Sequence, residues 1–321
     1  MPLDTQRMRA GKAGAPDGTK DNPSAAGATK GGTSHAGATQ GGTGIQAKLE
    51  AEAFSGLRDV VLAAGGIDLD LYKERFLLRR ITVRQRACGA PTLRAYLKLV
   101  SQNPVERGRL VKALTIHVSQ FFRNPSTFHA IQEVVLPVLL ARRQAGGRPL
   151  RLWSVGCACG EEPYSLAILL LEHGTESQQT HPSTIYATDI DPASLHQARE
   201  GRYPATSLTT LPAPWRKRYF AREGERYRVG PEARRLVFCK VHNILESVPF
   251  GRIDLILCRN VLIYMSEALQ ARVLQVLHEA LNPGGFLVLG KVEGLTGPAR
   301  DLLEPVNVPE RIYRKPGWRP R

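Results

Sequence analysis

Two adjacent carboxylates, Glu161 and Glu162, follow a turn of small residues at 156–160. An apolar segment at 152–155 leads into the turn, and Pro163 opens an apolar helix behind it. Strand, small-residue turn and buried helix begin a nucleotide-type α/β domain, in which a ligand approaches the backbone closely. The two acids would repel a phosphate and attract an ammonium or sulfonium group, and S-adenosylmethionine carries both cations. Alternatively, the acids simply favour a helix N-terminus.

Other polar residues end the later strand-like segments. Asp189 ends the second strand, where an acid can accept hydrogen bonds from the two hydroxyls of a ribose. Asn243 follows the third strand, and Arg259 and Asn260 follow the apolar part of the fourth. Ligands of open α/β sheets bind outside the carboxyl ends of the strands, so we expect these side chains to meet Glu161 at one edge of the sheet.

The elements that must position these residues alternate between strand and helix through residues 136–315. This alternation predicts an α/β domain with a parallel sheet and helices on both faces. The expected strands lie at 152–155, 184–191, 236–243 and 253–264, and 281–290 is expected to contain a helix end, a turn and the fifth strand. Asp191, just before Pro192, is expected to cap the following helix. Residues 202–235 form an insertion, within which 219–229 is expected to be a small hairpin that turns near Gly224.

Residues 49–135 are expected to form an N-terminal helical domain. In the helix predicted at 75–86, an apolar set can face a core: Phe76, Leu77, Ile81 and Val83. Five of these twelve residues are arginine. Such a run is either a solvated face or a docking surface for an acidic partner. The docking residues would be Arg79, Arg80, Arg84 and Arg86.

Composition limits the remaining possibilities. Residues 1–48 repeat Gly-Ala-Thr units with little to bury, which predicts a disordered low-complexity tail, and 316–321 form a short basic tail. The 321 residues carry 44 Lys and Arg against 29 Asp and Glu, a net charge of +15 that favours an acidic partner. No apolar run is long enough to span a membrane, and the first residues do not resemble a secretory signal. The five cysteines are expected to be reduced, and Cys157 and Cys159 lack the partners of a metal site.

Four motifs in this order resemble those of the CheR family of chemotaxis receptor methyltransferases. They are Ser119-Gln-Phe-Phe-Arg123, Trp153-Ser154 with Gly160-Glu-Glu-Pro-Tyr-Ser165, Ala187-Thr-Asp-Ile-Asp191, and Cys258-Arg-Asn-Val-Leu-Ile-Tyr264. The resemblance covers roughly residues 50–315 and implies a small all-helical domain, a Rossmann-like class I methyltransferase domain and a small antiparallel β insertion. It also implies S-adenosylmethionine-dependent methyl transfer, with S-adenosylhomocysteine as product, to glutamate side chains on the cytoplasmic methylation helices of chemoreceptors. The enzyme would be a cytoplasmic monomer without a metal.

The resemblance also assigns site residues. Cofactor contacts would be made by His117, Ser119, Arg123, Glu161, Asp189, Asn243, Ile244, Arg259 and Asn260. His117 departs from the asparagine common in the family, and Lys291-Val292 departs from the usual His/Ser-Ser before Glu293. Arg123 and Tyr264 would position the incoming carboxylate, although Tyr264 also fits a packed aromatic at a helix start.

Two other activities fit parts of the sequence. The basic charge suits a nucleic-acid methyltransferase, but the slot where such enzymes place Asp/Asn-Pro-Pro-Tyr/Phe here contains Arg259 to Tyr264. The second possible activity is that of a signalling adaptor, which binds the cofactor without catalysing methyl transfer. A glutamate carboxylate is already ionised at neutral pH, so the absence of a strong base in the motifs does not argue against activity.

The insertion bears on how a receptor is recognised. Some members of the family grip a receptor C-terminal pentapeptide with a longer, glycine-containing hairpin loop. Here the loop at 222–228 is shorter and has one glycine, with Glu223 and Glu225 at its tip. These acids would repel a peptide that ends in a carboxylate, so we expect that the pentapeptide is not required.

Overall fold

A computed structural model describes residues 40–65, 68–115, 119–145, 148–173, 182–246, 248 and 250–317, with side chains from residue 48 onward. The chain divides into two units, residues 1–45 and 46–321. His117, most of the expected tail at 1–48 and the end of the basic tail after residue 317 lie outside the described residues.

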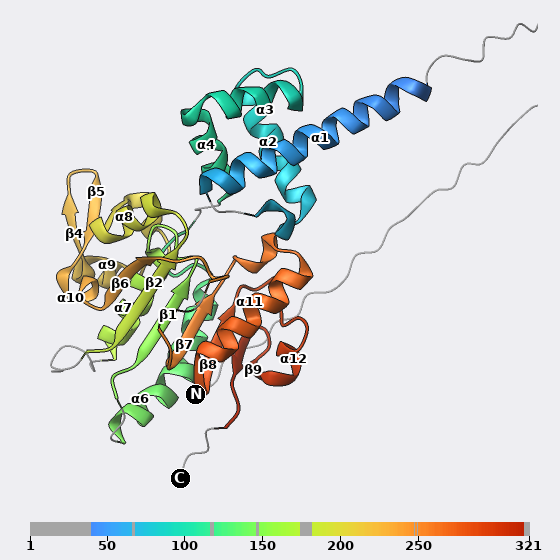
Figure 1. Cartoon of the computed structure of the whole chain (residues 1–321). Coiled ribbons are helices and arrows are strands. Elements are labelled where there is room, and N and C mark those ends of the chain that lie inside the picture. Colours follow the sequence, from blue (N-terminus) through green and yellow to red (C-terminus); the bar gives the residue numbers. More distant parts are fainter. Residues whose placement is uncertain are drawn as a thin grey trace, which may run out of the picture. The chain divides into compact units, whose positions relative to one another are not determined.

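Residues 40–114 contain only helices in their described part. These are α1 (Gln40–Gly65), η1 (Leu69–Leu71), α2 (Glu74–Ala87), α3 (Leu93–Gln102) and α4 (Pro104–Leu114) (Figure 1). The start of α1 at Gln40 lies within the segment that composition predicted as disordered. Asn103 ends α3 and caps α4, because its side chain accepts hydrogen bonds from the N–H groups of Val105 and Glu106. The helices share a core centred on Leu57, Leu77, Ile81, Tyr96 and Leu110.

Helix α2 buries a narrower face than the sequence predicted. Leu77 and Ile81 are buried and Phe76 packs against the same core, as expected. Val83, also expected to face the core, is 57% exposed. Its position two residues after Ile81 places it about 200° further around the helix, which directs it to the opposite side.

Arg84 belongs to the interior of the helical domain rather than to its charged surface. Its Nε and Nη2 atoms donate to the two carboxylate oxygens of Glu106, over 3.0 and 2.6 Å, and the Tyr96 hydroxyl donates to the same carboxylate over 3.0 Å. Burial alone would raise the pKa of Glu106, but the hydrogen bonds from Arg84, Cys88 and Tyr96 outweigh it and lower the pKa. The docking role expected for Arg84 is thus replaced by a structural one.

The larger domain is built on a seven-stranded sheet with the order β6-β2-β1-β7-β8-β10-β9. The strands are β1 (Arg151–Val155), β2 (Thr184–Asp189), β6 (Val237–Val241), β7 (Ile253–Cys258), β8 (Leu281–Leu289), β9 (Glu304–Asn307) and β10 (Ile312–Arg314). The first five pair in parallel, and β10 and β9 close one edge in antiparallel fashion. This is the parallel sheet that the alternation predicted.

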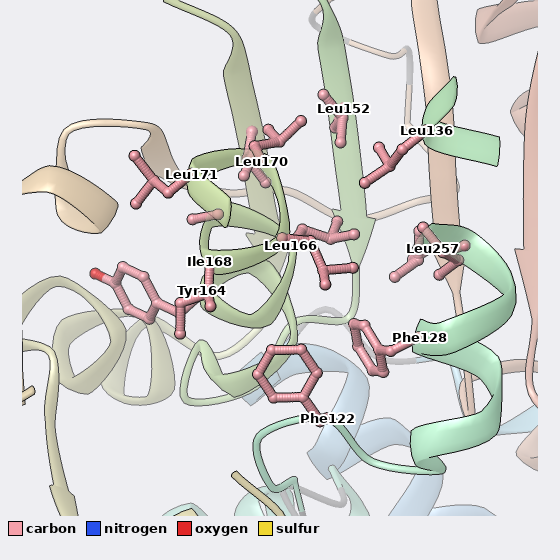
Figure 2. Packing of buried hydrophobic residues seen from close by; sticks show 14 of the residues in the cluster. Phe122, Phe128, Leu136, Leu152, Tyr164, Leu166, Ile168, Leu170, Leu171 and Leu257 are labelled. Atoms are coloured by element: carbon pink, nitrogen blue, oxygen red, sulfur yellow. The ribbon is translucent and has the colours of Figure 1, made fainter. Parts of the chain in front are cut away.

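Helices cover both faces of the sheet. They are α5 (Pro125–Ala130), the π-helix η2 (Ile131–Val135), α6 (Leu136–Gln144), α7 (Glu161–Glu172), α8 (Pro192–Glu200), the 3-10 turn η4 (Leu262–Tyr264), α11 (Glu267–Ala280) and α12 (Ala299–Leu302) (Figure 1). On one face Leu152 and Leu257 pack in a single cluster with Leu136 of α6 and Leu166 of α7 (Figure 2). On the other face Ile256 and its neighbours pack against α11. Side chains alternate along each strand, so one buried strand supplies both clusters.

Between β2 and β6 the insertion forms the expected small antiparallel sheet. Its elements are β3 (Arg202–Pro204), η3 (Ala205–Leu208), α9 (Ala213–Tyr219), β4 (Phe220–Glu223), β5 (Arg226–Val229) and α10 (Pro231–Arg234). The strand order is β3-β5-β4, and the β4–β5 hairpin turns at Gly224 in the left-handed conformation (φ 63°). Asp191 caps α8 as expected, because it accepts from the N–H groups of Ala193 and Ser194.

The packing changes earlier in the chain than the expected boundary at residue 135. Leu114 still belongs to the helical core. Phe121, Phe128 and Ile131 instead join the cluster beneath the sheet. Because α5, η2 and α6 pack on β1 and β7 and not on α1–α4, we place them with the α/β domain.

We predict that Arg84→Ala loosens α3 and α4. The change removes the nearest cation from the buried Glu106 carboxylate and leaves only the more exposed Arg109, 3.9 Å away, which costs about 3 kcal/mol. Hydrogen exchange of the backbone amides at 93–114 should then accelerate roughly 100-fold or more. Arg79→Ala, an exposed arginine on the same helix, should leave exchange nearly unchanged. Equal exchange in the two variants would contradict the structural role of Arg84.

Candidate functional site

Two neighbouring cavities open at the carboxyl ends of β1, β2 and β7. The first is lined by Tyr72, Leu114, Thr115, Val155, Thr188, Asp189, Ile190, His242, Asn243, Ile244, Val261 and Met265. The second, here called the polar cavity, is lined by Ser119, Gln120, Arg123, Phe128, Cys157, Ala158, Glu162 and Arg259. Gly156, Asn260 and Tyr264 line both. Asp189, Asn243 and Ile244 therefore line the first cavity, Ser119, Arg123 and Arg259 line the polar one, and Asn260 lines both. Glu161 is not among the residues that line either cavity, although its neighbour Glu162 lines the polar one.

The turn at 156–160 separates β1 from α7 and forms part of both walls. Gly156, Ala158 and Gly160 all have left-handed backbones, with φ of 63°, 47° and 95°. A Cβ on Gly156 would lie 2.7 Å from the Val261 side chain, so only glycine allows this close approach. The small residues thus serve the turn geometry that the sequence indicated.

Asp189 fastens this turn to the end of β2. Its Oδ2 accepts from the Ala158 N–H over 2.9 Å, and its Oδ1 accepts from the Asp191 N–H over 3.0 Å. Each carboxylate oxygen can accept a second hydrogen bond. Asp189 therefore shapes the first cavity and also presents acceptors to it. Asn243 likewise both holds its loop and faces the cavity. Its Oδ1 accepts from the Leu245 N–H, and the residue lines the first cavity.

Glu161 has an unsatisfied acceptor in the interior. The residue is only 4% exposed, and its Oε2 atom is buried with no hydrogen-bond donor in the described part of the chain. Burial raises the pKa of Glu161, while hydrogen bonds from the backbone and from Ser119 oppose the rise. A buried acceptor without a donor is costly, and a ligand ammonium would satisfy it. The residues present therefore fit the cationic amino-acid end of S-adenosylmethionine.

Glu162 has a different role from its neighbour. Its Oε1 accepts from the Ser154 hydroxyl over 2.8 Å, and its Oε2 accepts from Arg259 Nη1 over 3.1 Å. The Arg259 side chain is 1% exposed, so this is a buried ion pair. Its Nη2 atom donates to the Arg123 carbonyl (2.7 Å) and to Asn124 Oδ1 (2.9 Å). Arg259 consequently holds the 121–124 segment as well as lining the polar cavity.

The 121–124 segment is strained around Arg123. Phe122 and Asn124, on either side of it, have φ of 51° and 61°, which is costly for residues other than glycine. The Ser165 hydroxyl accepts from the Phe122 N–H over 2.9 Å, and the Phe122 ring packs on Phe128. These contacts fix the backbone so that Arg123 lines the polar cavity.

Tyr264 lies where the helical domain meets the site. Its ring packs on Phe76 of α2 with centroids 4.7 Å apart, and its carbonyl accepts from the Lys73 N–H over 2.9 Å. Burial raises the pKa of Tyr264, and the charges of Arg123 and Arg80 oppose the rise. Tyr264 is thus a packed aromatic that also lines both cavities, and its role in positioning the carboxylate stays a prediction.

Several site residues had no signal in the sequence. Tyr72, Leu114 and Thr115 come from the helical domain and reach the first cavity only through the fold. Gln120 was visible within the motif but had no assigned role. Glu293 was noticed only as the end of a variant segment, and yet it holds the loop that carries Asn260. Spacing along the chain cannot reveal such long-range contacts.

Comparison with known proteins assigns both domains. Residues 117–312 match the family "CheR methyltransferase, SAM binding domain", and residues 52–115 match "CheR methyltransferase, all-alpha domain". The chain belongs to the CheR methyltransferase family. The division between the two matches falls where the packing changes, after Leu114.

Relatives with chemotaxis names cover most of this CheR-family chain. A probable chemotaxis protein methyltransferase of Rhizobium etli is 32% identical over 265 residues, which cover 80% of this chain and 98% of the relative. A chemotaxis protein methyltransferase of Listeria monocytogenes is 35% identical over 234 residues, covering 73% and 87%. An uncharacterized 104.1 kDa protein of Rhodobacter capsulatus is 34% identical over 272 residues, but this chain spans only 28% of its length. The family and its named relatives support S-adenosylmethionine-dependent methylation in chemotaxis.

Other features of the chain concern metals, thiols and membranes. The described residues contain no cluster of His, Cys, Asp or Glu side chains that could hold a metal ion. All five cysteines are free thiols. Among the described helices, none has the length and apolar composition needed to cross a bilayer.

We predict that cofactor affinity depends on the ionisation of Glu161. The ammonium requires a carboxylate, and burial has raised the pKa of this group, so affinity should fall as the pH drops through that raised pKa. The limiting slope is about tenfold in Kd per pH unit. Calorimetric titration with S-adenosylhomocysteine should show this loss in the parent protein and a flatter profile with weaker binding in Glu161→Gln. Glu200→Gln, on the exposed end of α8, is the control; a Glu161→Gln profile that matches it would contradict the assignment.

Proposed function

We propose that this protein transfers the methyl group of S-adenosylmethionine to glutamate side chains of chemoreceptors and forms glutamate methyl esters. The observation that carries the proposal is the composition of the polar cavity beside the cofactor site. It presents Arg123 and Tyr264, while its acid, Glu162, is bound to Arg259 and Ser154. A carboxylate substrate suits this lining, because it is attracted by a cation and needs no general base.

The side chains have distinct tasks in this mechanism. S-adenosylmethionine, when bound, supplies an electrophilic methyl on a sulfonium. Glu161 would hold the ammonium end, and Asp189 would accept hydrogen bonds from the ribose hydroxyls. Arg123 attracts the incoming carboxylate, and the Tyr264 hydroxyl, protonated at neutral pH as in any tyrosine, donates a hydrogen bond to it. The chain mainly aligns the reacting atoms and excludes water.

The exposed arginines of α2 fit the substrate that the proposal requires. Arg79 and Arg86 are exposed, and Arg80 is half-buried with its guanidinium 5.9 Å from the Phe76 ring. Phe76 in turn packs on Tyr264, so this charged face is continuous with the edge of the site. We propose that Arg79, Arg80 and Arg86 dock acidic methylation helices of receptors, and that Arg84 supports the helix from inside. We propose that the enzyme acts in the cytoplasm, on the cytoplasmic part of receptors, and that it acts as a monomer.

Methyl transfer from labelled cofactor tests the activity directly. Receptor cytoplasmic fragments, RNA and DNA would be offered separately to the parent protein. We expect label on the receptor fragment alone, and base treatment should release it as methanol, which marks an ester. Label on nucleic acid, or base-stable label on protein, would contradict the proposal. Cofactor binding without transfer to any of the three would instead support a non-catalytic adaptor.

We predict that Arg79→Glu combined with Arg86→Glu slows receptor methylation by about tenfold at low ionic strength. The attraction between exposed charges is screened by salt, so the difference from the parent should shrink as salt is added. S-adenosylhomocysteine affinity should not change. A matched variant, Arg216→Glu with Arg272→Glu, changes the same charge on exposed residues of α9 and α11. If both variants give the same rates and the same salt dependence, α2 is only a solvated face.

We also predict that a receptor C-terminal pentapeptide is not required. The structure changes part of the reason, because Glu223 is paired with Arg202 at 2.8 Å and with Arg228 at 3.5 Å and is not a free acid. Glu225, exposed at the turn, and the short β4–β5 loop remain as the basis. Titration with aromatic-ended receptor peptides should show no micromolar binding. Micromolar binding that is lost when residues 222–228 are altered would disprove this prediction.

A further inference from the structure

Glu293 is a buried carboxylate that lies just beyond the site. It follows β8, is 5% exposed, and is surrounded by backbone N–H groups. Its Oε2 accepts from the N–H groups of Asn260 (2.8 Å) and Gly290 (2.6 Å). Its Oε1 accepts from those of Leu262 (2.8 Å) and Ile263 (3.2 Å). One side chain therefore satisfies four main-chain donors, three of them in the loop at 259–264, which follows β7 and includes η4.

The surrounding backbone is shaped to admit this carboxylate. A Cβ on Gly290 would lie 2.5 Å from Glu293 Oε2 and 2.9 Å from the Asn260 nitrogen, so no side chain fits there. Asn260 itself has φ of 60°, a left-handed conformation that is unfavourable for residues other than glycine, although asparagine tolerates it better than most. The hydrogen bond from its N–H to Glu293 helps to stabilise that conformation.

The loop held by Glu293 carries residues of both cavities. Asn260 lines the first cavity and the polar cavity, and Tyr264 lines both at the end of the same loop. On its other side the loop is held by the helical domain, because the Ser266 N–H donates to the Leu71 carbonyl and the Lys73 Nζ donates to the Ile263 carbonyl, each over 2.9 Å. Glu293 is thus the inner support of a loop whose outer support comes from another domain.

We propose that Glu293 is a positioning residue for methyl transfer: its carboxylate sets the backbone of residues 260–263, and through it the placement of Asn260 against the cofactor and of Tyr264 against the substrate. The part concerning the substrate rests on the proposed function, and the part concerning the cofactor does not. Neutral isosteres cannot replace the carboxylate. In glutamine an NH₂ group would face two N–H donors whichever way the amide is turned, so two of the four hydrogen bonds would become repulsive contacts.

The test compares three variants of this cradle with one matched control. Glu293→Gln keeps the size of the side chain, and Glu293→Ala removes the carboxylate. Gly290→Ala keeps the carboxylate but displaces it, because the new Cβ occupies its position. Gly294→Ala makes the same substitution four residues later, where a Cβ meets nothing within 4 Å, and serves as the control. The readouts are the Kd for S-adenosylhomocysteine, the single-turnover methylation rate at saturating cofactor and the thermal midpoint.

We expect Glu293→Gln and Gly290→Ala to raise the S-adenosylhomocysteine Kd by about tenfold or more and to slow the single-turnover rate by at least as much, well below their thermal midpoints. Gly294→Ala should match the parent. In Glu293→Ala, added formate should restore cofactor affinity in a saturable way, because four N–H groups would bind the small carboxylate, while the parent should not respond.

Lower thermal midpoints with parent-like Kd and rate in the folded protein would overturn the proposal, since a merely stabilising role predicts that pattern. If Glu293→Ala does not fold, Glu293→Gln still decides the question, because it keeps the size of the side chain and does not crowd Asn260, whereas the Cβ of Gly290→Ala would also meet the Asn260 nitrogen. A change in cofactor Kd with no methylation of receptor by any form, the parent included, would count against the proposed substrate and not against the cradle. An unchanged Kd in both Glu293→Gln and Gly290→Ala would refute the cradle whatever the substrate is.

Discussion

The site depends on one buried ion pair, between Arg259 at the end of β7 and Glu162 in the first turn of α7. A guanidinium that is 1% exposed is tolerable only when its charge is matched and most of its donors are used, and here the Nη atoms are bonded while Nε has no acceptor among the described residues. Those donors reach the Arg123 carbonyl and Asn124 Oδ1. A strand end, a helix start and the segment that precedes α5 are thereby held at one point. Removing either charge would leave the other buried without its ion-pair partner. The positions of the β7 end, the α7 start and the 121–124 segment therefore all depend on this pair.

This arrangement separates support from binding. Glu162 and Arg259 neutralise each other, and Glu293 is saturated by backbone N–H groups, so these buried charges hold loops. Glu161 has an oxygen left unsatisfied, and Arg123 lines the polar cavity. The first suits a cation and the second suits an anion. A buried acceptor next to the cavity-lining Glu162 and a cation in the polar cavity together suit transfer from a cationic donor to an anionic acceptor.

The sequence was sufficient to predict those elements whose structure follows from local rules. The small-residue turn, the cap at Asp191, the five parallel strands and the hairpin at Gly224 all depend on neighbours along the chain or on simple periodicity. The predictions were wrong or incomplete where the deciding partner is distant. Arg84 was assigned to a charged face because Glu106 could not be recognised as its buried partner. Val83 was placed in the core because apolar character was given more weight than its angle on the helix.

Contacts between residues far apart in the chain also explain the remaining differences between the predictions and the structure. Glu223 seemed a free acid in the linear sequence, but Arg202 and Arg228 lie on neighbouring strands of the small sheet. Glu293 gained a role only once β8 brought it beneath the loop after β7. The early domain boundary reflects helices α5 and α6, whose pattern is helical but whose buried face matches the sheet. Periodicity predicts a helix without indicating which core it joins.

A crystal structure with S-adenosylhomocysteine would test the central claim most directly. The account predicts that the ligand ammonium lies about 2.8 Å from Glu161 Oε2 and that its ribose hydroxyls donate to Asp189. Arg123 and Tyr264 should face the sulfur from the polar cavity, with the Arg259–Glu162 pair and the Glu293 cradle unchanged. A ligand bound with Glu161 Oε2 still lacking a donor, or with its sulfur turned away from the polar cavity, would contradict it.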